Sequence, residues 1–393
     1  MRTVLGLVAI AACGGDGNHG QTDAMVDQDA THLLDAATCT RTAPTGDHAH
    51  RVVVSHPYDA ASAKSNDWEV LDLSMTGVFS RPSHHFTMGR ADVGEVAFTP
   101  DGKIGIAVQT EDGSLGVFSL DANGTPTVIA ANWKGPFYAE RIVMAPSGDR
   151  AYVLDDEFRD IGGGIYRIDI GCDGTITDGG LVIPAKLPSA LALTTAGDAL
   201  VAASDIGSVM TRGVHVVEWN AAPSVLASVD AFGDDMAIVA GSTVTRDGGF
   251  FMVGDASQFA SVPNRIAVVP VTGAHFGTPY TIPSVMDPIA LVASPFTDDV
   301  LVASGFGDAL YTLHRDSDGM WRMKGDITYS GAKPQLPGGA VRIDTGALRG
   351  TVLVGENLGV RRVDLGTNGI VDHGLYALGS GTQNIVGAVG VTP

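Results

Sequence analysis

Carboxylate side chains recur in this chain beside short apolar stretches, and their type and spacing suit them to bind cations. One group directly follows an apolar stretch and the other directly precedes one: Asp156, Asp205, Asp255, Asp308 and Glu356 form the first, and Asp92, Glu140, Asp235 and Asp287 the second. Carboxylate oxygens suit Ca2+ or Mg2+, and a concave surface lined by one sign of charge attracts cations. The alternative is that these are ordinary turn and solubilising residues of an acidic protein.

The histidines are a second set of candidate ligands, above all His48, His50, His56, His84 and His85. Imidazole nitrogens must converge on one point, at about 2 Å from it, to hold a zinc ion, and proximity in sequence does not provide this. Two neighbours on a strand point to opposite faces, which separates His84 from His85. We therefore predict no metal site from these histidines and assign them to the surface or to an N-terminal spacer.

The sequence lacks the motifs of well-defined chemistry. It has no His-Glu-x-x-His, no Cys-x-x-Cys, no Gly-x-Ser-x-Gly and no phosphate-binding loop. The formal net charge is −20, from 44 Asp and Glu against 24 Lys and Arg, so most of the surface repels phosphates. We predict no nucleic-acid partner, and no cofactor other than the candidate divalent cation.

The elements that position these residues follow a repeat of an apolar strand, a tight polar turn and a second apolar strand. Its turns fall at intervals of 46 to 51 residues, at Pro100, Pro146, Thr195, Arg246, Pro295 and Asp344. A third and a fourth strand follow each pair, for example at residues 116–120 and 127–130. Four short strands in about 49 residues are typical of one blade of a β-propeller.

The two ends of the chain complete one further blade. Residues 384–393 predict a first strand that stops where its turn should begin. Residues 51–54 begin instead with a second strand, followed by strands at 68–73 and near 85–87. Six whole repeats and this composite blade predict an all-β, seven-bladed β-propeller over residues 51–393, with blade 1 closed by the C-terminal strand.

Propeller topology divides the connections between strands into two groups. The loops that enter first strands and the loops between second and third strands share one face, called here the mouth face. The Asp-Gly turns between first and second strands lie on the opposite face. All the carboxylates named above fall in the first group, with His56 at the equivalent place of the composite blade. We therefore predict a candidate ligand-binding mouth lined by acidic side chains.

Residues 145–153 (APSGDRAYV) and 98–103 (FTPDGK) resemble the repeat of bacterial YVTN and lactonase-like seven-bladed propellers. The likeness covers most of residues 51–393, although no blade carries the full tetrad and residues 152–155 (YVLD) come nearest. The resemblance implies the propeller fold. It also implies an alternative function, a lactonase-like hydrolase with a metal or a His/Glu/Arg set at the axial mouth, with Glu140, Arg141, Asp235 and His56 as candidates.

The first 12 residues have the layout of a secretory signal, with Arg2 before an apolar run and small residues before Cys13. Residues 10–13 (IAAC) resemble the bacterial lipoprotein lipobox, which implies cleavage before Cys13 and diacylation of that cysteine. The apolar run is shorter than the roughly 20 residues of a membrane-spanning helix. The alternatives are a plain signal peptide with a chance cysteine and a mis-assigned start codon.

Residues 13–50 are rich in Gly, Asp, Thr and Ala, and we predict that they form a flexible acidic spacer behind the lipid anchor. Two cysteines remain once Cys13 carries lipid. Cys39 and Cys172 either form a disulfide in an oxidising compartment, which would pin the spacer to the folded part, or stay as two free thiols.

These features together predict a lipid-anchored protein of the bacterial cell envelope, at the periplasmic or surface side of the outer membrane. A binding or scaffold module is favoured over an enzyme, because the fold and anchor signals are strong and no catalytic motif accompanies them. Its expected partner is an envelope protein, a glycan or a small cationic ligand. We expect a monomer that reaches the membrane only through its anchor.

Overall fold

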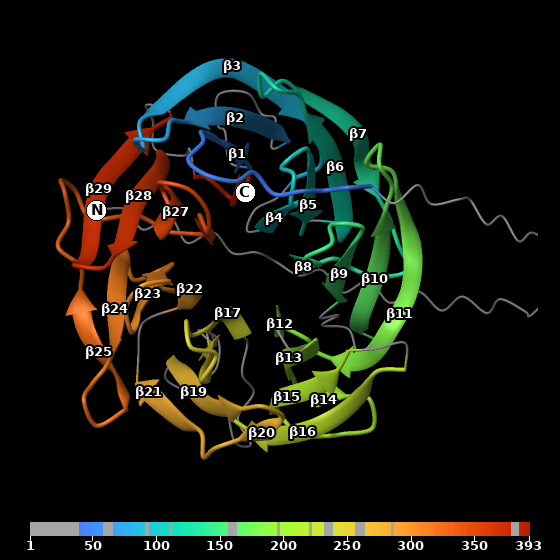
Figure 1. Cartoon of the computed structure of the whole chain (residues 1–393), viewed down its shortest axis with the longest axis vertical. Coiled ribbons are helices and arrows are strands. Elements are labelled where there is room, and N and C mark those ends of the chain that lie inside the picture. The colour runs from blue at the N-terminus through green and yellow to red at the C-terminus, as the bar shows by residue number, and fades with distance from the viewer. Residues whose placement is uncertain are drawn as a thin grey trace, which may run out of the picture. The chain divides into compact units, whose positions relative to one another are not determined.

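A computed structural model describes residues 39–57, 66–90, 94–110, 112–155, 163–194, 197–219, 222–231, 239–255, 264–283, 287–378 and 385–393. The compact unit is Thr38–Pro393, and its β-sheets stand side by side around a common axis (Figure 1). In these ranges no helix has the length and apolar composition that a membrane span requires.

Seven blades of four antiparallel strands make up this unit, and the strands of each blade follow one another from the axis outwards. Blade 1 contains β30 (Ala388–Val391), β1 (His50–His56), β2 (Asp67–Leu73) and β3 (Phe79–Thr87). Blade 2 contains β4 (Gly94–Phe98), β5 (Ile104–Gln109), β6 (Ser114–Leu120) and β7 (Pro126–Trp133). Blade 3 contains β8 (Arg141–Met144), β9 (Arg150–Asp155), β10 (Gly164–Ile170) and β11 (Ile176–Lys186). Blade 4 contains β12 (Ala190–Leu193), β13 (Asp198–Ala203), β15 (Gly213–Glu218) and β16 (Ser224–Asp230).

The other three blades follow the same order. Blade 5 contains β17 (Val239–Val244), β18 (Phe250–Asp255), β19 (Arg265–Thr272) and β21 (Tyr280–Pro283). Blade 6 contains β22 (Pro288–Ala293), β23 (Asp299–Ser304), β24 (Ala309–Arg315) and β25 (Trp321–Asp326). Blade 7 contains β26 (Ala340–Arg342), β27 (Thr351–Glu356), β28 (Gly359–Gly366) and β29 (Gly369–Ala377). Two short strands lie outside this scheme: β14 (Asp205–Ile206) pairs with β11, and β20 (His275–Phe276) pairs with β19.

The ends of the chain meet in blade 1 and close the ring. β30 pairs antiparallel with β1, where Val52 lies opposite Val391, and it pairs in parallel with β4, where Ala388 lies opposite Gly94. Blades 1 and 2 therefore form one continuous eight-stranded sheet. The predicted seven-bladed propeller, closed by the C-terminal strand, is confirmed.

The cores lie between adjacent blades. Successive side chains of a strand point to opposite faces, so each second strand fills two cores. Val52 packs in a cluster with Leu353 of blade 7, whereas its neighbour Val53 packs in a cluster with Phe118 of blade 2, and all four side chains are fully buried. Burial of one such side chain contributes roughly 1.5–3 kcal/mol. The second strands are apolar along most of their length because both of their faces are covered.

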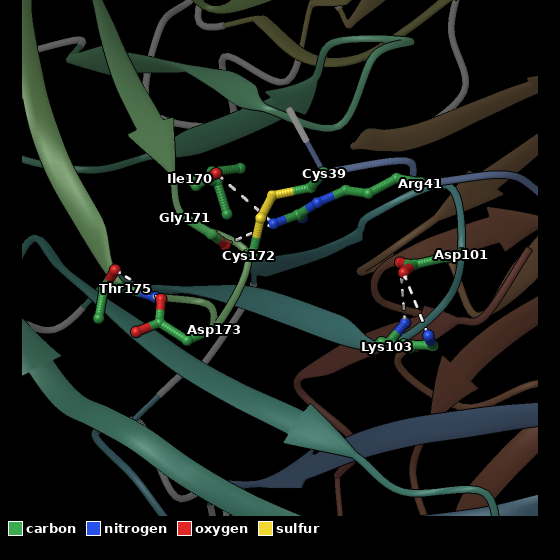
Figure 2. Close-up of a disulfide and its surroundings, with 9 residues drawn as sticks. All are labelled: Cys39, Arg41, Asp101, Lys103, Ile170, Gly171, Cys172, Asp173 and Thr175. Atoms are coloured by element: carbon green, nitrogen blue, oxygen red, sulfur yellow. Dashed lines mark hydrogen bonds and ion pairs between the residues drawn. A yellow bond between two sulfur atoms is a disulfide. The ribbon is translucent and has the colours of Figure 1, made fainter. Parts of the chain in front are cut away.

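The segment before β1 is tied to the propeller at both of its ends. A disulfide joins Cys39 to Cys172, in the turn between β10 and β11, with 5.4 Å between the Cα atoms (Figure 2). Arg41 Nη2 donates a hydrogen bond to the Gly171 carbonyl at 2.6 Å. At the other end, His50 Nδ1 donates to the Thr392 carbonyl at 2.8 Å. Of the two alternatives for the cysteines, the structure has the disulfide.

Other predictions concern parts of the chain outside the described residues. Cys13, the signal peptide at residues 1–12 and residues 13–38 of the predicted spacer all lie there. Within the described ranges, the strands differ from prediction in detail. β3 begins at Phe79, ahead of the predicted fourth strand near 85–87, and a long connection at residues 327–339 separates β25 from β26. The apolar pattern did not indicate either feature, because β3 contains Arg81, Pro82 and two histidines.

Candidate functional site at the mouth face

The antiparallel order of each blade makes its connections alternate between two faces, so the mouth face contains the loops predicted for it. Three of the predicted mouth residues, Asp92, Asp156 and Asp235, lie outside the described residues. The other six lie in mouth-face loops or at the strand ends next to them: Glu140, Asp205, Asp255, Asp287, Asp308 and Glu356. Their surroundings differ greatly, and these differences decide what each can do.

Glu356, at the end of β27, is held inside blade 7 by an arginine. Arg361 of β28 donates to Glu356 through Nη2 at 3.0 Å and through Nε at 3.2 Å. The same guanidinium donates to Asp372 of β29 at 2.8 Å. Side-chain exposure is 1% for Arg361, 2% for Glu356 and 0% for Asp372. Burial raises the pKa of Glu356, and the hydrogen bond from Arg361 opposes that rise. Arg361 therefore connects three strands, and the Glu356 carboxylate does not face the solvent.

Asp255 occupies the same place at the end of β18 in blade 5. Its side chain is fully buried, and Arg265, the first residue of β19, donates to it through Nε at 3.2 Å. Asp155, at the end of β9, is also buried, with 3% exposure. Acidic residues at the ends of second strands therefore belong to the interior of these blades, beside the third strand.

Blade 1 has a related cluster around Glu69 of β2, which is fully buried. His56 Nε2 lies 3.2 Å from Glu69 Oε2, and Arg81 Nη2 donates to the same oxygen at 2.9 Å. Burial alone would raise the pKa of Glu69, but the hydrogen bonds to His56 and Arg81 outweigh it and lower that pKa. Arg81 also donates to the carbonyl of Leu378 at 2.7 Å, which links blade 1 to the end of blade 7.

Asp287 immediately precedes β22, the innermost strand of blade 6, and differs from the paired carboxylates above. It is 3% exposed, and its φ of 54° places it in the left-handed region that favours glycine. Its backbone carbonyl accepts a hydrogen bond from Gly305 N–H at 3.0 Å, and its carboxylate accepts one from Phe306 N–H. Burial raises the pKa of Asp287, because that single backbone donor does not offset the lost hydration.

Asp308, Asp205 and Glu140 are the predicted mouth residues that reach the solvent. Asp308 is exposed, has a φ of 46°, and accepts a hydrogen bond from Leu336 N–H at 2.7 Å. Asp205 is half-buried in β14, opposite Lys186 of β11. Glu140 is half-buried at the entrance to β8. Among the described residues, fewer of the predicted carboxylates reach the solvent at the mouth face than the sequence suggested.

The opposite face is also rich in carboxylates, but these are turn residues. A hydroxyl two positions earlier donates to the aspartate in several turns between first and second strands: Thr99 to Asp101, Thr245 to Asp247, and Thr297 to Asp299. Asp149 occupies the same turn of blade 3, and the hydrogen bond from Arg150 lowers its pKa to about 2. The acidic charge of the chain is therefore distributed over both faces.

The residues proposed for a hydrolase are tied to different neighbours where they are described. Arg141 donates to Glu95 at 3.0 Å, whereas His56 contacts Glu69 in another blade. Asp235 lies outside the described residues. Among the described residues, no three His, Cys, Asp or Glu side chains come together in a group that could hold a metal ion.

The sequence did not reveal the arginines that form hydrogen bonds to these carboxylates. Arg361 lies within β28, Arg81 lies within β3, and Arg265 begins β19. The side chains of Arg361 and Arg265 are 1% and 18% exposed, whereas that of Arg81 is 42% exposed. For Arg361, a charged residue among the apolar residues of a strand was the available signal, because a buried cation requires an anion nearby.

Neither a family model nor a curated protein sequence matches the chain. Solved structures do resemble it. A hypothetical selenium-binding protein from Sulfolobus tokodaii is 9% identical with a TM-score of 0.64, and the match covers 89% of this chain and 94% of that one. The periplasmic gluconolactonase of Pseudomonas aeruginosa is 12% identical with a TM-score of 0.60, and the match covers 88% and 99%.

A protein from Lactobacillus plantarum gives a similar result, with 12% identity, a TM-score of 0.58 and coverage of 88% of this chain and all of that one. The chain therefore shares the β-propeller fold of these structures. At these identities the likeness concerns the path of the backbone, and one propeller fold serves many unrelated functions. Function must therefore be argued from the side chains of the mouth face.

Proposed function

We propose that this protein is a lipid-anchored binding module of the bacterial cell envelope, which holds a cationic partner at its mouth face. The observation that supports this most directly is how the carboxylates are used. Those at the ends of β18 and β27 are buried and hydrogen-bonded to arginines, whereas Asp308 is exposed in a loop of the same face. The groups that reach the solvent form a surface suited to binding.

Exposed apolar side chains accompany these carboxylates on the mouth face. Phe306 is 60% exposed in the loop after β23, and Leu336 is 38% exposed in the connection between β25 and β26. Large apolar side chains beside charged ones are typical of surfaces that contact a partner. This combination favours recognition of a partner over surface charge that only solubilises the protein.

The envelope location rests on two features of the chain. Disulfides persist in oxidising compartments, and Cys39 is joined to Cys172. The second feature is the lipobox-like sequence at residues 10–13, whose Cys13 is the proposed site of the lipid anchor. Cys13→Ser should release the protein from the membrane fraction of the producing cell, with the wild-type chain as the control. Continued membrane fractionation of the variant would contradict the anchor.

Binding is tested with hexalysine, spermidine and a chitosan oligosaccharide, titrated calorimetrically into the full mature chain at low ionic strength. We expect Asp205→Asn with Asp308→Asn to weaken binding of at least one probe by about threefold to tenfold. The control, Asp121→Asn with Asp173→Asn, removes the same formal charge from exposed turns of the opposite face. Equal weakening in both double variants would show that only the net charge matters and would contradict a binding face.

A lactonase-like hydrolase remains the second candidate, and Asp287 is the observation that favours it. A carboxyl with a raised pKa near the axis suits a general acid or base. Hydrolysis of glucono-δ-lactone by the wild-type chain, lost in Asp287→Asn while the melting temperature is retained, would support this candidate. Absence of turnover by the wild-type chain with and without added Ca2+ or Mg2+ would contradict it for this substrate.

A further inference from the structure

Unusual backbone conformations are concentrated in one sector of the mouth face. The described residues other than glycine that have a positive φ all lie in mouth-face connections. Leu187 follows blade 3, and the others belong to blades 6 and 7: Asp287, Asp308, Leu336 and Leu358, with φ between 46° and 74°. Such conformations persist only where surrounding contacts impose them, and they are frequent at binding sites. The contacts that impose them here can be identified.

The turn after β23, residues 305–308, is fixed from both sides. On the axial side, Gly305 and Phe306 donate their N–H groups to the carbonyl and carboxylate of Asp287. On the outer side, Asp308 Oδ1 accepts the N–H of Leu336 at 2.7 Å, from the long connection between β25 and β26. These contacts hold the backbone on either side of Phe306.

The long connection at residues 327–339 is fixed in turn by the buried ions of blade 7. Ser330 N–H donates to Asp372 at 2.7 Å, and Arg361 donates to the Ala332 carbonyl at 2.9 Å. Asn357 N–H donates to the Gln335 carbonyl at 2.9 Å. The buried Arg361 cluster therefore positions Leu336, although neither Arg361 nor Asp372 reaches the surface.

The turn at residues 305–308 and the connection at residues 327–339 carry three exposed side chains, Phe306, Asp308 and Leu336, called here the blade 6 patch. Phe306 is 60% exposed and Leu336 is 38% exposed, although both are apolar. Lys333, a cation of the same connection, contacts Asp326 at 2.5 Å. Asp308 forms no ion pair with any of the described residues. The patch therefore combines apolar area with a carboxylate that is not ion-paired to any described residue.

We infer that the blade 6 patch binds a basic side chain, arginine or lysine, flanked by apolar residues in an extended segment of a partner protein. A cation can lie over the face of Phe306 while it pairs with Asp308, and an apolar neighbour can cover Leu336. A sugar chain fits less well, because two of the three exposed side chains offer no hydrogen bond to its hydroxyls. A surface fixed before binding loses little conformational entropy when the partner arrives.

This inference rests on the proposed function and names the partner and the sector of the mouth. The probes are synthetic 12-residue peptides that contain Leu-Arg-Leu, Leu-Lys-Leu or Leu-citrulline-Leu, since citrulline keeps the shape of arginine without its charge. They are titrated into the full mature chain by fluorescence anisotropy. We expect the arginine peptide to bind about tenfold more tightly than the citrulline peptide.

Two substitutions test the patch. Phe306→Ser should weaken the arginine peptide by about tenfold, as expected for loss of a cation–aromatic contact and its apolar area. Asp308→Asn should remove most of the preference for arginine over citrulline, while its side-chain oxygen still accepts the Leu336 N–H. Asparagine also tolerates a positive φ. Neither side chain is in a core, so the melting temperatures should match the wild type.

Two control variants test whether binding depends on the blade 6 patch or on the mouth face as a whole. Met210→Ser removes an exposed apolar side chain from blade 4 on the same face, and Asp121→Asn removes a charge from the opposite face; both should leave peptide affinity unchanged. Equal losses in Met210→Ser and Phe306→Ser would overturn the blade 6 patch while leaving a mouth-face binding module. No binding of the arginine peptide at millimolar concentration, or stronger Phe306-dependent binding of a chitosan oligosaccharide, would overturn the peptide partner.

Discussion

Arg361→Met provides the sharpest test of whether Glu356 is a structural ion or a ligand-binding group. The guanidinium makes three hydrogen bonds to carboxylate oxygens and one to the Ala332 carbonyl, and it is 1% exposed. Methionine fills similar volume but leaves Glu356 and Asp372 buried without a cation. Breaking a buried ion pair in this way costs about 3–5 kcal/mol.

The expected loss corresponds to a fall in melting temperature of about 4–7 °C, since unfolding entropy is about 2.1 cal/mol/K per residue. The loss should also depend on pH. Burial raises the pKa of Glu356, and without the opposing hydrogen bond from Arg361 this carboxyl binds a proton more readily in the folded protein than in the unfolded chain. Folded-state pKa values above the unfolded values make stability rise as pH falls. The difference from wild type should therefore shrink between pH 8 and pH 5.

Urea unfolding at these two pH values measures the effect, and a compensated variant is its control. Arg361→Met combined with Glu356→Gln and Asp372→Asn removes the cation together with both charges, so it should recover part of the lost stability. A loss below about 1 kcal/mol in Arg361→Met, equal at both pH values, would refute the structural assignment.

Two further predictions concern the junction of the chain ends. Replacing Cys39 and Cys172 by serine should lower the free energy of unfolding by about 2–5 kcal/mol, because the disulfide joins residues 133 positions apart. Thermal melts of the wild type and the variant without reductant measure this loss. Equal melting temperatures would contradict it. Burial lowers the pKa of His50, and its Nε2 has no hydrogen-bond partner among the described residues. The unfolded chain therefore takes up the proton first, and stability should fall as pH drops below about 6.5. His50→Asn should flatten this dependence between pH 7.5 and 5 in urea unfolding, and an unchanged slope would exclude His50 as its source.

The fold could be predicted because its determinants are local and repeated. Each second strand is apolar on both faces, since it lies between two blades. In blades 2 to 7, the turn after each first strand contains Asp, Gly or both. The composite blade followed from the order of strand types at the two ends, and β30 between β1 and β4 bears this out. Irregular parts, such as β14 and the connection at residues 327–339, have no repeat to reveal them.

The surroundings of the mouth carboxylates could not be predicted in the same way. Glu356 ends a second strand and Asp308 lies in the loop after one, and the sequence around them does not show which carboxylate is buried. They differ because the third strand of blade 7 contains Arg361 close to Glu356. The third strand of blade 6, Ala309–Arg315, has its arginine at the end far from Asp308. Strand register, which places that arginine beside one carboxylate and away from the other, becomes visible only in the folded chain.

The net charge of −20 therefore does not identify a binding face by itself. On the opposite face, hydroxyl and backbone donors hold the turn aspartates, and inside blades 5 and 7 arginines hold Asp255 and Glu356. A cationic partner gains most where a carboxylate remains accessible to solvent beside apolar area. In the described part of the chain, Asp308 between Phe306 and Leu336 meets both conditions, because a neutral backbone N–H holds it and no arginine does.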